Sequence, residues 1–265
     1  MTGSQRNDNW GSAALFGIFI VGNEAVPEAE WWAMTPAHTS VHAARVTAGA
    51  PWASWNSNRD SVQLVDDLQH GADQFASMQL SAAVVGHSSS SFLGGKGWDK
   101  AIIARLAEVL GSELTISTNG LDCLAALKAC GIHRPLLVLP PWFGPGIVTT
   151  GAQYFIDHGV SPAATLSLDP GSKWRHLAPE SRYPQGFGFE QELDPLYRQI
   201  VNAYESPADG ILIAGTGFRC VAIIDKLEAE LDVPVVTANQ ASLWHSLRQS
   251  GNTAEVAGYG QLFTR

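Results

Sequence analysis

The stretch Ala82-Ala83-Val84-Val85-Gly86-His87-Ser88-Ser89-Ser90-Ser91 decides the fold class of this chain. An apolar run that ends in Gly and hydroxyl residues is typical of a buried strand followed by a loop. Open α/β folds bind their ligands at the C-terminal ends of parallel strands. His87 stands at such an end, and an unperturbed imidazole has a pKa of about 6.5. We therefore expect a site here that transfers protons and binds an anion.

The second part of the chain contains a matching place at 211–217, Ile-Leu-Ile-Ala-Gly-Thr-Gly. It carries Gly215 where the first carries His87. A tight loop just before a helix also has free backbone amides that can hold an anion. The two places therefore predict a site with a titratable group on one side only.

Apolar runs alternate with helical patterns along the whole chain. This alternation predicts parallel sheets joined by crossover helices. The expected strands are 15–21, 82–85, 114–116, 136–139, 211–214 and 233–236. The expected helices are 62–75, 98–110, 120–129, 151–158, 195–204, 221–231 and 241–249. Segments 22–59, 140–150 and 161–192 are expected to be irregular, and loops of this length are usually lids or binding loops.

The strand order repeats, and residues 117–128 align without gaps on residues 237–248. Each segment has a hydroxyl residue at a strand end and an Asn, Asn119 or Asn239, as the expected helix N-cap. The repeat predicts an α/β fold of two pseudo-symmetric Rossmann-like domains with short parallel sheets and an active-site cleft between them. One half is expected to hold 12–119 plus 239–265 and the other 120–238, with 1–11 as a flexible N-terminus.

The composition excludes several classes of protein. The 265 residues carry a formal charge of −9, which argues against nucleic acid and against an anionic membrane surface as partners. No apolar run approaches the roughly 20 residues of a membrane span. The three cysteines form no disulfide framework, so a reduced, cytoplasmic protein is expected. A homo-oligomer is compatible with the sequence.

Four segments carry a resemblance to a known family: 87–92 with Gly94-Gly95, 210–219, 233–245 and 258–263. Residues 210–219 and 233–245 resemble segments of maleate cis-trans isomerases, and 258–263 resembles the tail of arylmalonate decarboxylases. Residues 87–92 with Gly94-Gly95 resemble the first active-site loop of both enzymes, which form one branch of the aspartate/glutamate racemase superfamily. The family moves protons with one cysteine from each half. In this sequence the two cysteine positions fall on His87 and Gly215, so both catalytic thiols are missing.

The resemblance implies two catalytic residues, His87 and Glu24. Glu24 follows the first strand, where a carboxylate near His87 would orient the ring and raise its basicity. The implied substrate-binding residues are Asn23, Ser88, Ser89, Ser90, Trp142, Gly215, Thr216 and Gly217. Asn23 is the alternative to Glu24, since a one-residue gap separates the two alignments. Trp142 lies near a family Tyr that binds the carboxylate. No metal site and no cofactor are expected.

Three functions remain open from the sequence. The first is a cofactor-independent enzyme that acts next to a carboxylate or carbonyl of a small, planar or aromatic substrate, as a decarboxylase or isomerase with His87 as its one base. The second is a hydrolase, for example of a cyclic amide or imide, in which His87 activates water. The third is a small-carboxylate binding protein without chemistry. The retained carboxylate-binding loops favour the first.

Overall fold

The computed structural model describes residues 9–265 and contains two four-stranded parallel sheets. The first sheet has the order β2-β1-β5-β6, and the second has the order β10-β9-β7-β8. When the four strands of each sheet are numbered along the chain, and the second sheet is read from β8 to β10, both sheets have the same order: second, first, third, fourth. The strands are β1 (Ala14–Val21), β2 (Thr39–Val46), β5 (Ala82–Val85), β6 (Thr115–Thr118), β7 (Leu136–Leu139), β8 (Ala164–Ser167), β9 (Ile211–Ile213) and β10 (Val235–Thr237). The repeated order confirms the predicted fold of two similar α/β halves with short parallel sheets.

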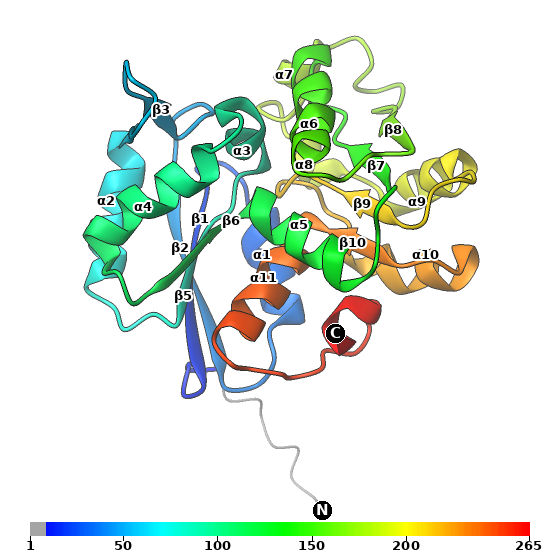
Figure 1. Cartoon of the computed structure of the whole chain (residues 1–265). Helices are drawn as coiled ribbons and strands as arrows, with labels where there is room; N and C mark the ends of the chain where they lie inside the picture. The colour runs from blue at the N-terminus through cyan, green and yellow to red at the C-terminus, as the bar shows by residue number, and fades with distance from the viewer. Residues whose placement is uncertain (1–8) are drawn as a thin grey trace, which may run out of the picture.

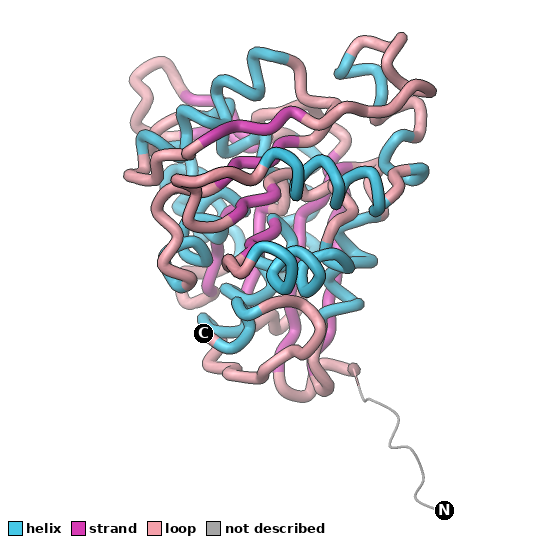
Figure 2. The backbone as a smooth tube through the Cα atoms, turned by 90° about the vertical axis from the view of Figure 1, so that its right-hand side faces the viewer, coloured by secondary structure: helices cyan, strands magenta, loops and turns pink. Residues whose placement is uncertain are grey.

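Helices surround both sheets, and the two halves lie side by side (Figure 1). The view turned by 90° shows the strands lying among the helices (Figure 2). The α-helices are α1 (Val26–Met34), α2 (Asp66–Ala76), α3 (Ser88–Gly94), α4 (Trp98–Leu110), α5 (Asn119–Ala129), α6 (Pro145–Asp157), α7 (Pro179–Arg182), α8 (Phe187–Glu190), α9 (Leu193–Ala203), α10 (Ile224–Leu231) and α11 (Ala238–Gln249). Two 3-10 helices are η1 (Val221–Ile223) and η2 (Gln261–Thr264), and β3 (Ala53–Trp55) pairs with β4 (Val62–Leu64) as an antiparallel hairpin.

The centre of the molecule is made by α5 and α11, which pack on one another between the halves. One buried cluster runs through this centre and includes side chains of both sheets, such as Ile18 and Leu212. A second cluster, with Phe19 and Leu106, lies between the first sheet and helices α2 and α4. Helix α11 touches β5 and β6 as well as β10. The predicted assignment of 239–265 to the first half therefore stays a prediction.

The structure corrects two expectations about secondary structure. Residues 22–59, expected to be irregular, contain α1, β2 and β3. Strand β2 lies at the edge of its sheet and carries polar side chains such as His42 and Arg45, so it lacks the continuous apolar run of a central strand. Residues 62–75 are a strand followed by a helix, because buried Val62 and Leu64 alternate with exposed Gln63 before the helical pattern begins.

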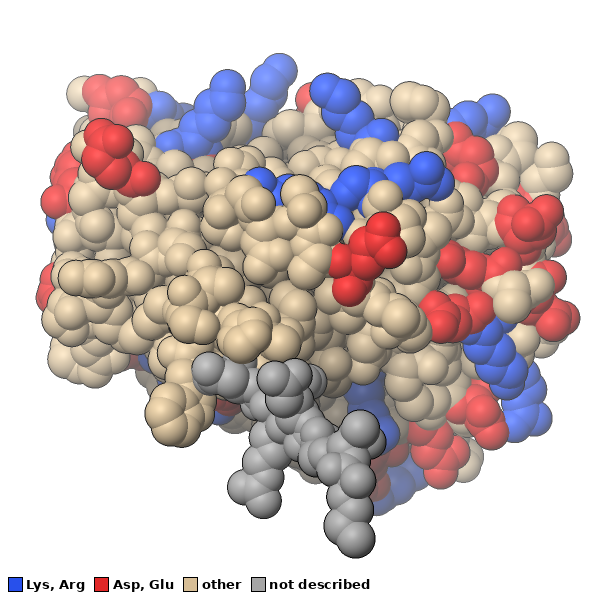
Figure 3. Space-filling model, turned by 90° about the horizontal axis from the view of Figure 1, so that it is seen from below, with Lys and Arg blue, Asp and Glu red and all other residues tan. Residues whose placement is uncertain are grey.

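The segments expected as lids also contain regular structure. Residues 140–150 include the start of α6, and 161–192 include β8, α7 and α8. The expectation for residues 1–11 lies mostly outside the described part of the chain. Across residues 9–265 no helix is both long and apolar enough to cross a membrane. The face seen from below carries Asp and Glu crowded along one edge, intermixed with Lys and Arg, beside a broad uncharged area (Figure 3).

Candidate active site

The ends of three strands converge where the two halves meet. The Thr216 hydroxyl, just beyond β9, donates a buried 3.0 Å hydrogen bond to the carbonyl of Gly86, just beyond β5. Glu24, just beyond β1, points at Gly217: a Cβ built on Gly217 would lie 2.4 Å from Glu24 Oε1. The fold therefore brings together the neighbourhood of His87, Glu24 and the Gly-Thr-Gly loop, as expected for strand ends of α/β sheets.

The His87 ring is held by two neighbours. Its Nδ1 lies 2.9 Å from Ser90 Oγ, and its ring lies 4.3 Å from the Trp52 ring at an angle of 31°. The Ser90 Oγ also accepts a hydrogen bond from the backbone N–H of Trp52. Because the Ser90 O–H has no other acceptor among the described residues, it is assigned as the donor to His87 Nδ1, and the ring proton is then on Nε2.

Burial lowers the pKa of His87 to about 3. The ring is therefore neutral at physiological pH, because desolvation disfavours the charged imidazolium. The sequence suggested an imidazole that exchanges protons near pH 6.5. In this environment His87 instead presents a neutral Nε2–H donor and is a weak base.

Glu24 is a buried acid, whereas Asn23 is exposed to solvent. The turn before α1 is fixed by Arg45, whose Nη1 donates to the carbonyls of Gly22 and Glu24. Burial raises the pKa of Glu24 to about 8, and its Oε2 has no hydrogen-bond partner. Glu24 is therefore a protonated carboxylic acid at neutral pH, and of the two alternatives it is the side chain directed into the molecule.

Free backbone N–H groups line the same place from both halves. The N–H groups of Ser88 and Ser89 open α3 and make no hydrogen bond among the described residues, and the same holds for residues 215–217. Gly215 has a φ of +103°, a conformation that L side chains rarely adopt, and a Cβ there would lie 2.4 Å from Pro140 Cγ. The second loop thus has a backbone that only glycine readily allows, which is incompatible with a thiol at this position.

The predicted serines differ in how their hydroxyls are used. Ser88 Oγ donates to Asn119 Oδ1, and Ser90 Oγ bridges His87 and Trp52. The Ser89 hydroxyl has no hydrogen bond to another described residue. Among the three hydroxyls, that of Ser89 is therefore the one available to a ligand.

The helix that follows the Gly-Thr-Gly loop does not supply free amides. It begins only at η1, and the N–H groups of Cys220 and Val221 both donate to Glu30 Oε1. Asn239 donates to Glu30 Oε2, and burial raises the pKa of Glu30 to about 7. The expectation of an anion-binding helix N-terminus at this point is therefore wrong, because a buried carboxyl already occupies it.

Asn119 and Asn239 are not the N-caps that the sequence indicated. The caps of α5 and α11 are Thr118 and Thr237, each of which accepts a hydrogen bond from a first-turn N–H. Asn119 donates to the carbonyl of Ala238, and Asn239 donates to the carbonyl of Thr216. The two buried amides therefore have corresponding tasks, in that each supports backbone near the interface between the halves.

An aromatic cluster covers the loop from the second half. Trp142 packs on Tyr183, Phe187 and Phe218 with ring centroids 4.7, 5.8 and 5.6 Å away. Trp142 thus belongs to the wall of the site. Tyr183 lies in the segment 161–192, and nothing in the local sequence pattern indicates a functional role for it.

A cavity of about 550 Å³ lies beside this cluster, not at His87. Its lining includes Trp174, Phe187 and Phe218, so it shares two rings with the aromatic wall. The cavity and the converging strand ends are therefore neighbours separated by these side chains.

Two of the three cysteines adjoin residues that support the converging strand ends: Cys123 Sγ lies 3.9 Å from Asn119 Oδ1, and the N–H of Cys220 donates to Glu30. Burial raises the pKa of Cys123 and Cys220, and that of Cys130 to about 11. A thiolate is disfavoured at all three positions. Within residues 9–265, no group of three or more His, Cys, Asp or Glu side chains is arranged to hold a metal ion.

The arylmalonate decarboxylase family model matches residues 189–263. A mutant arylmalonate decarboxylase in a sulfate-associated form superposes with a TM-score of 0.75 at 21% identity, over 95% of this chain and 100% of that one. The maleate isomerase Iso of Pseudomonas putida gives 0.77 at 16% identity, over 95% and 98%. The maleate cis-trans isomerase of Nocardia farcinica, bound to TRIS, gives 0.76 at 15% identity, over 95% and 98%. No curated protein sequence matches the chain. These similarities confirm the resemblance to this branch, and at such identities the structures show a shared fold.

Proposed function

We propose that this chain, which has the fold of arylmalonate decarboxylase and maleate isomerase, is a cofactor-independent acid/base enzyme that decarboxylates a small malonate-type substrate. The observation that carries the proposal is Glu24. A buried carboxylic acid that stays protonated at neutral pH, with an unpartnered oxygen, faces a loop of free N–H groups. Such an acid is suited to deliver a proton inside a closed site.

The reaction can be written with these groups alone. One carboxylate of the malonate is held by the N–H groups of Ser88 and Ser89 and of residues 215–217. The bond to the other carboxylate breaks, CO₂ leaves, and the electron pair remains as an enediolate on the carboxylate that is held. Glu24 then gives its proton to the α-carbon, and the Glu24 carboxylate takes a new proton from solvent. Each cycle therefore consumes one solvent proton.

The free N–H groups supply the main stabilisation in this scheme. Preorganised donors of an oxyanion site are each worth roughly 2.7–4 kcal/mol in comparable enzymes. The neutral Nε2–H of His87 adds a donor at the end of the neighbouring strand. His87 accordingly acts in this proposal as a hydrogen-bond donor to the enediolate, and Glu24 takes the role of the proton donor.

Two other reactions fit the site less well. The Nocardia farcinica isomerase has a structure with a covalently bound succinylcysteine, whereas this chain has His87 and Gly215 at the positions of the family thiols. Hydrolysis needs a base that activates water, and a His87 with a pKa of about 3 is weak in that role. Decarboxylation needs neither a thiolate nor a strong base.

The test is a screen of malonates, cis-dicarboxylates and cyclic amides, followed by proton NMR in deuterated water. The proposal expects loss of CO₂ from a malonate and one solvent deuteron on the α-carbon. Cis-trans conversion of a dicarboxylate would favour the isomerase, and ring opening of a cyclic amide would favour the hydrolase. A ligand that binds without turnover would favour a binding protein, and any of these three outcomes would overturn the proposal.

A further inference from the structure

We propose that Tyr183 is a substrate-binding residue, whose hydroxyl donates a hydrogen bond to the carboxylate oxygen held above Gly217. The inference rests on the proposed function, because it adds one contact to the same substrate. Tyr183 comes from the segment 161–192, outside the sequence segments that resemble the family.

The first argument is an unused hydroxyl. Among residues 9–265, four buried side-chain polar atoms lack a hydrogen-bond partner, and two of them are Glu24 Oε2 and the Tyr183 hydroxyl. Both side chains face one glycine: a Cβ on Gly217 would lie 2.4 Å from Glu24 Oε1 and 2.9 Å from the Tyr183 hydroxyl. Two buried, unpaired polar groups at one point cost stability, so a ligand that pairs with both explains their presence.

The second argument is that the Tyr183 ring is fixed in place. Its centroid lies 4.7 Å from that of Trp142, and a Cβ on Gly188 would lie only 2.5 Å from the Tyr183 ring. Backbone on one side and an indole on the other leave the phenol little freedom. A hydroxyl that is already positioned loses little entropy when it binds a ligand.

The third argument is the chemistry of the groups that converge. The protonated Glu24 and the Tyr183 phenol are hydrogen-bond donors, and burial raises the pKa of Tyr183, so the phenol keeps its proton. The N–H of Gly217 is a third donor without a partner. Glu24 is the titratable group that acts on the Tyr183 hydroxyl. Two side-chain donors that face Gly217, together with the unpaired N–H of that residue, fit a carboxylate oxygen beside the glycine. A carboxylate is the group that the proposed reaction places there.

The experiment compares Tyr183→Phe with the wild type. The variant keeps the ring that packs on Trp142 and removes only the hydroxyl, so it should fold. We expect its melting temperature to equal or exceed that of the wild type, because a buried unpaired group is lost. We expect the Kd of malonate or maleate, measured by calorimetry at pH 7, to rise about 10-fold or more, as for a hydrogen bond to a charged group.

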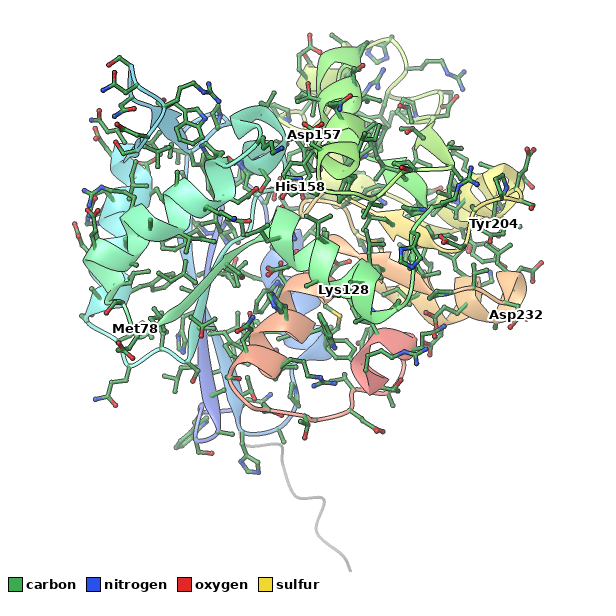
Figure 4. The ribbon with its side chains drawn as sticks, viewed as in Figure 1. Met78, Lys128, Asp157, His158, Tyr204 and Asp232 are labelled. Atoms are coloured by element: carbon green, nitrogen blue, oxygen red, sulfur yellow. The ribbon has the colours of Figure 1, made fainter. Side chains whose placement is uncertain are left out.

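The matched control is Tyr204→Phe. The Tyr204 hydroxyl donates to the carbonyl of Ala208 at 2.7 Å, and Tyr204 lies beyond the end of α9 at the far side of the second half (Figure 4). This variant loses a made hydrogen bond, so its melting temperature should fall by about 2 °C while the Kd stays unchanged. The two phenols are thus expected to give opposite patterns.

A double variant separates the substrate contact from a contact to Glu24. If Tyr183 only supports Glu24, adding Tyr183→Phe to Glu24→Gln will not weaken binding further, and this result would overturn the inference. An unchanged Kd and unchanged turnover in Tyr183→Phe would also overturn it while the proposed function stands. A wild-type protein that neither binds nor converts these dicarboxylates would overturn both.

Discussion

Replacing Glu24 with glutamine should make the protein more stable at high pH. The folded protein keeps this carboxyl protonated up to a pKa of about 8, whereas an unperturbed glutamate has a pKa of 4.5. The unfolded chain therefore releases the proton first as pH rises. The stability that protonated Glu24 contributes is fully present below pH 4.5, and it is lost as the pH rises through about 8.

The size of this effect follows from the two pKa values. A rise from 4.5 to about 8 corresponds to about 5 kcal/mol at 1.36 kcal/mol per pH unit. Glutamine has nearly the same shape and does not ionise, so the unfolding free energy of the Glu24→Gln variant does not include this pH-dependent loss. We expect the difference between Glu24→Gln and the wild type to grow by about 3–5 kcal/mol between pH 5 and pH 9.

The assay is urea unfolding at pH 5, 7 and 9 for the wild type, Glu24→Gln and the control Glu108→Gln. Glu108 is exposed and pairs with Arg105 on the surface, so its variant should follow the wild type within about 0.5 kcal/mol at every pH. If the unfolding free energy of Glu24→Gln falls with pH as steeply as that of the wild type, then Glu24 is not a buried, protonated acid.

Three further variants test the site through turnover of the substrate found in the screen. His87→Ala should lower kcat about 10²-fold or more by removing one oxyanion donor, and wild-type turnover in this variant would remove His87 from the mechanism. The kcat/KM of the wild type should show no ionisation of His87 near pH 6.5, because burial lowers the pKa of this residue to about 3. Gly217→Ala should abolish turnover, because its methyl group would lie 2.4 Å from Glu24 Oε1; an active variant would show that substrate does not approach this glycine. Cys220→Ala should leave kcat unchanged, because burial keeps this thiol protonated; a large loss would point to thiol chemistry.

Much of the architecture could be predicted, because each buried parallel strand is a short run of apolar residues in the sequence. Strand β7 is a continuous run of four buried apolar residues, and helix α4 follows a helical pattern that begins after Gly97. The sequence does not indicate edge strand β2, because half of its residues are polar. The hairpin β3–β4 was missed because its second strand is only three residues long and merges with the helical pattern of α2.

The candidate site also has a part that the local sequence predicts and a part that depends on the folded structure. The positions of His87 and Gly215 beyond strand ends could be predicted, because each residue follows an apolar run; their roles stay predictions. The pKa values of His87 and Glu24 could not be predicted, since they depend on burial beneath side chains far away in the sequence. Tyr183 and Glu30 were out of reach for the same reason: their roles depend on contacts with Gly217 and with the N–H of Cys220, which only the folded chain brings together.

Proton delivery by Glu24 from one side of the site can be followed in the product formed in deuterated water from a prochiral malonate. We predict that the wild type gives a monocarboxylate with one deuterium on the α-carbon in a single configuration, and that Glu24→Gln gives little or none of it. A product with both configurations in equal amounts, or one formed equally well by Glu24→Gln, would exclude Glu24 as the group that delivers the proton.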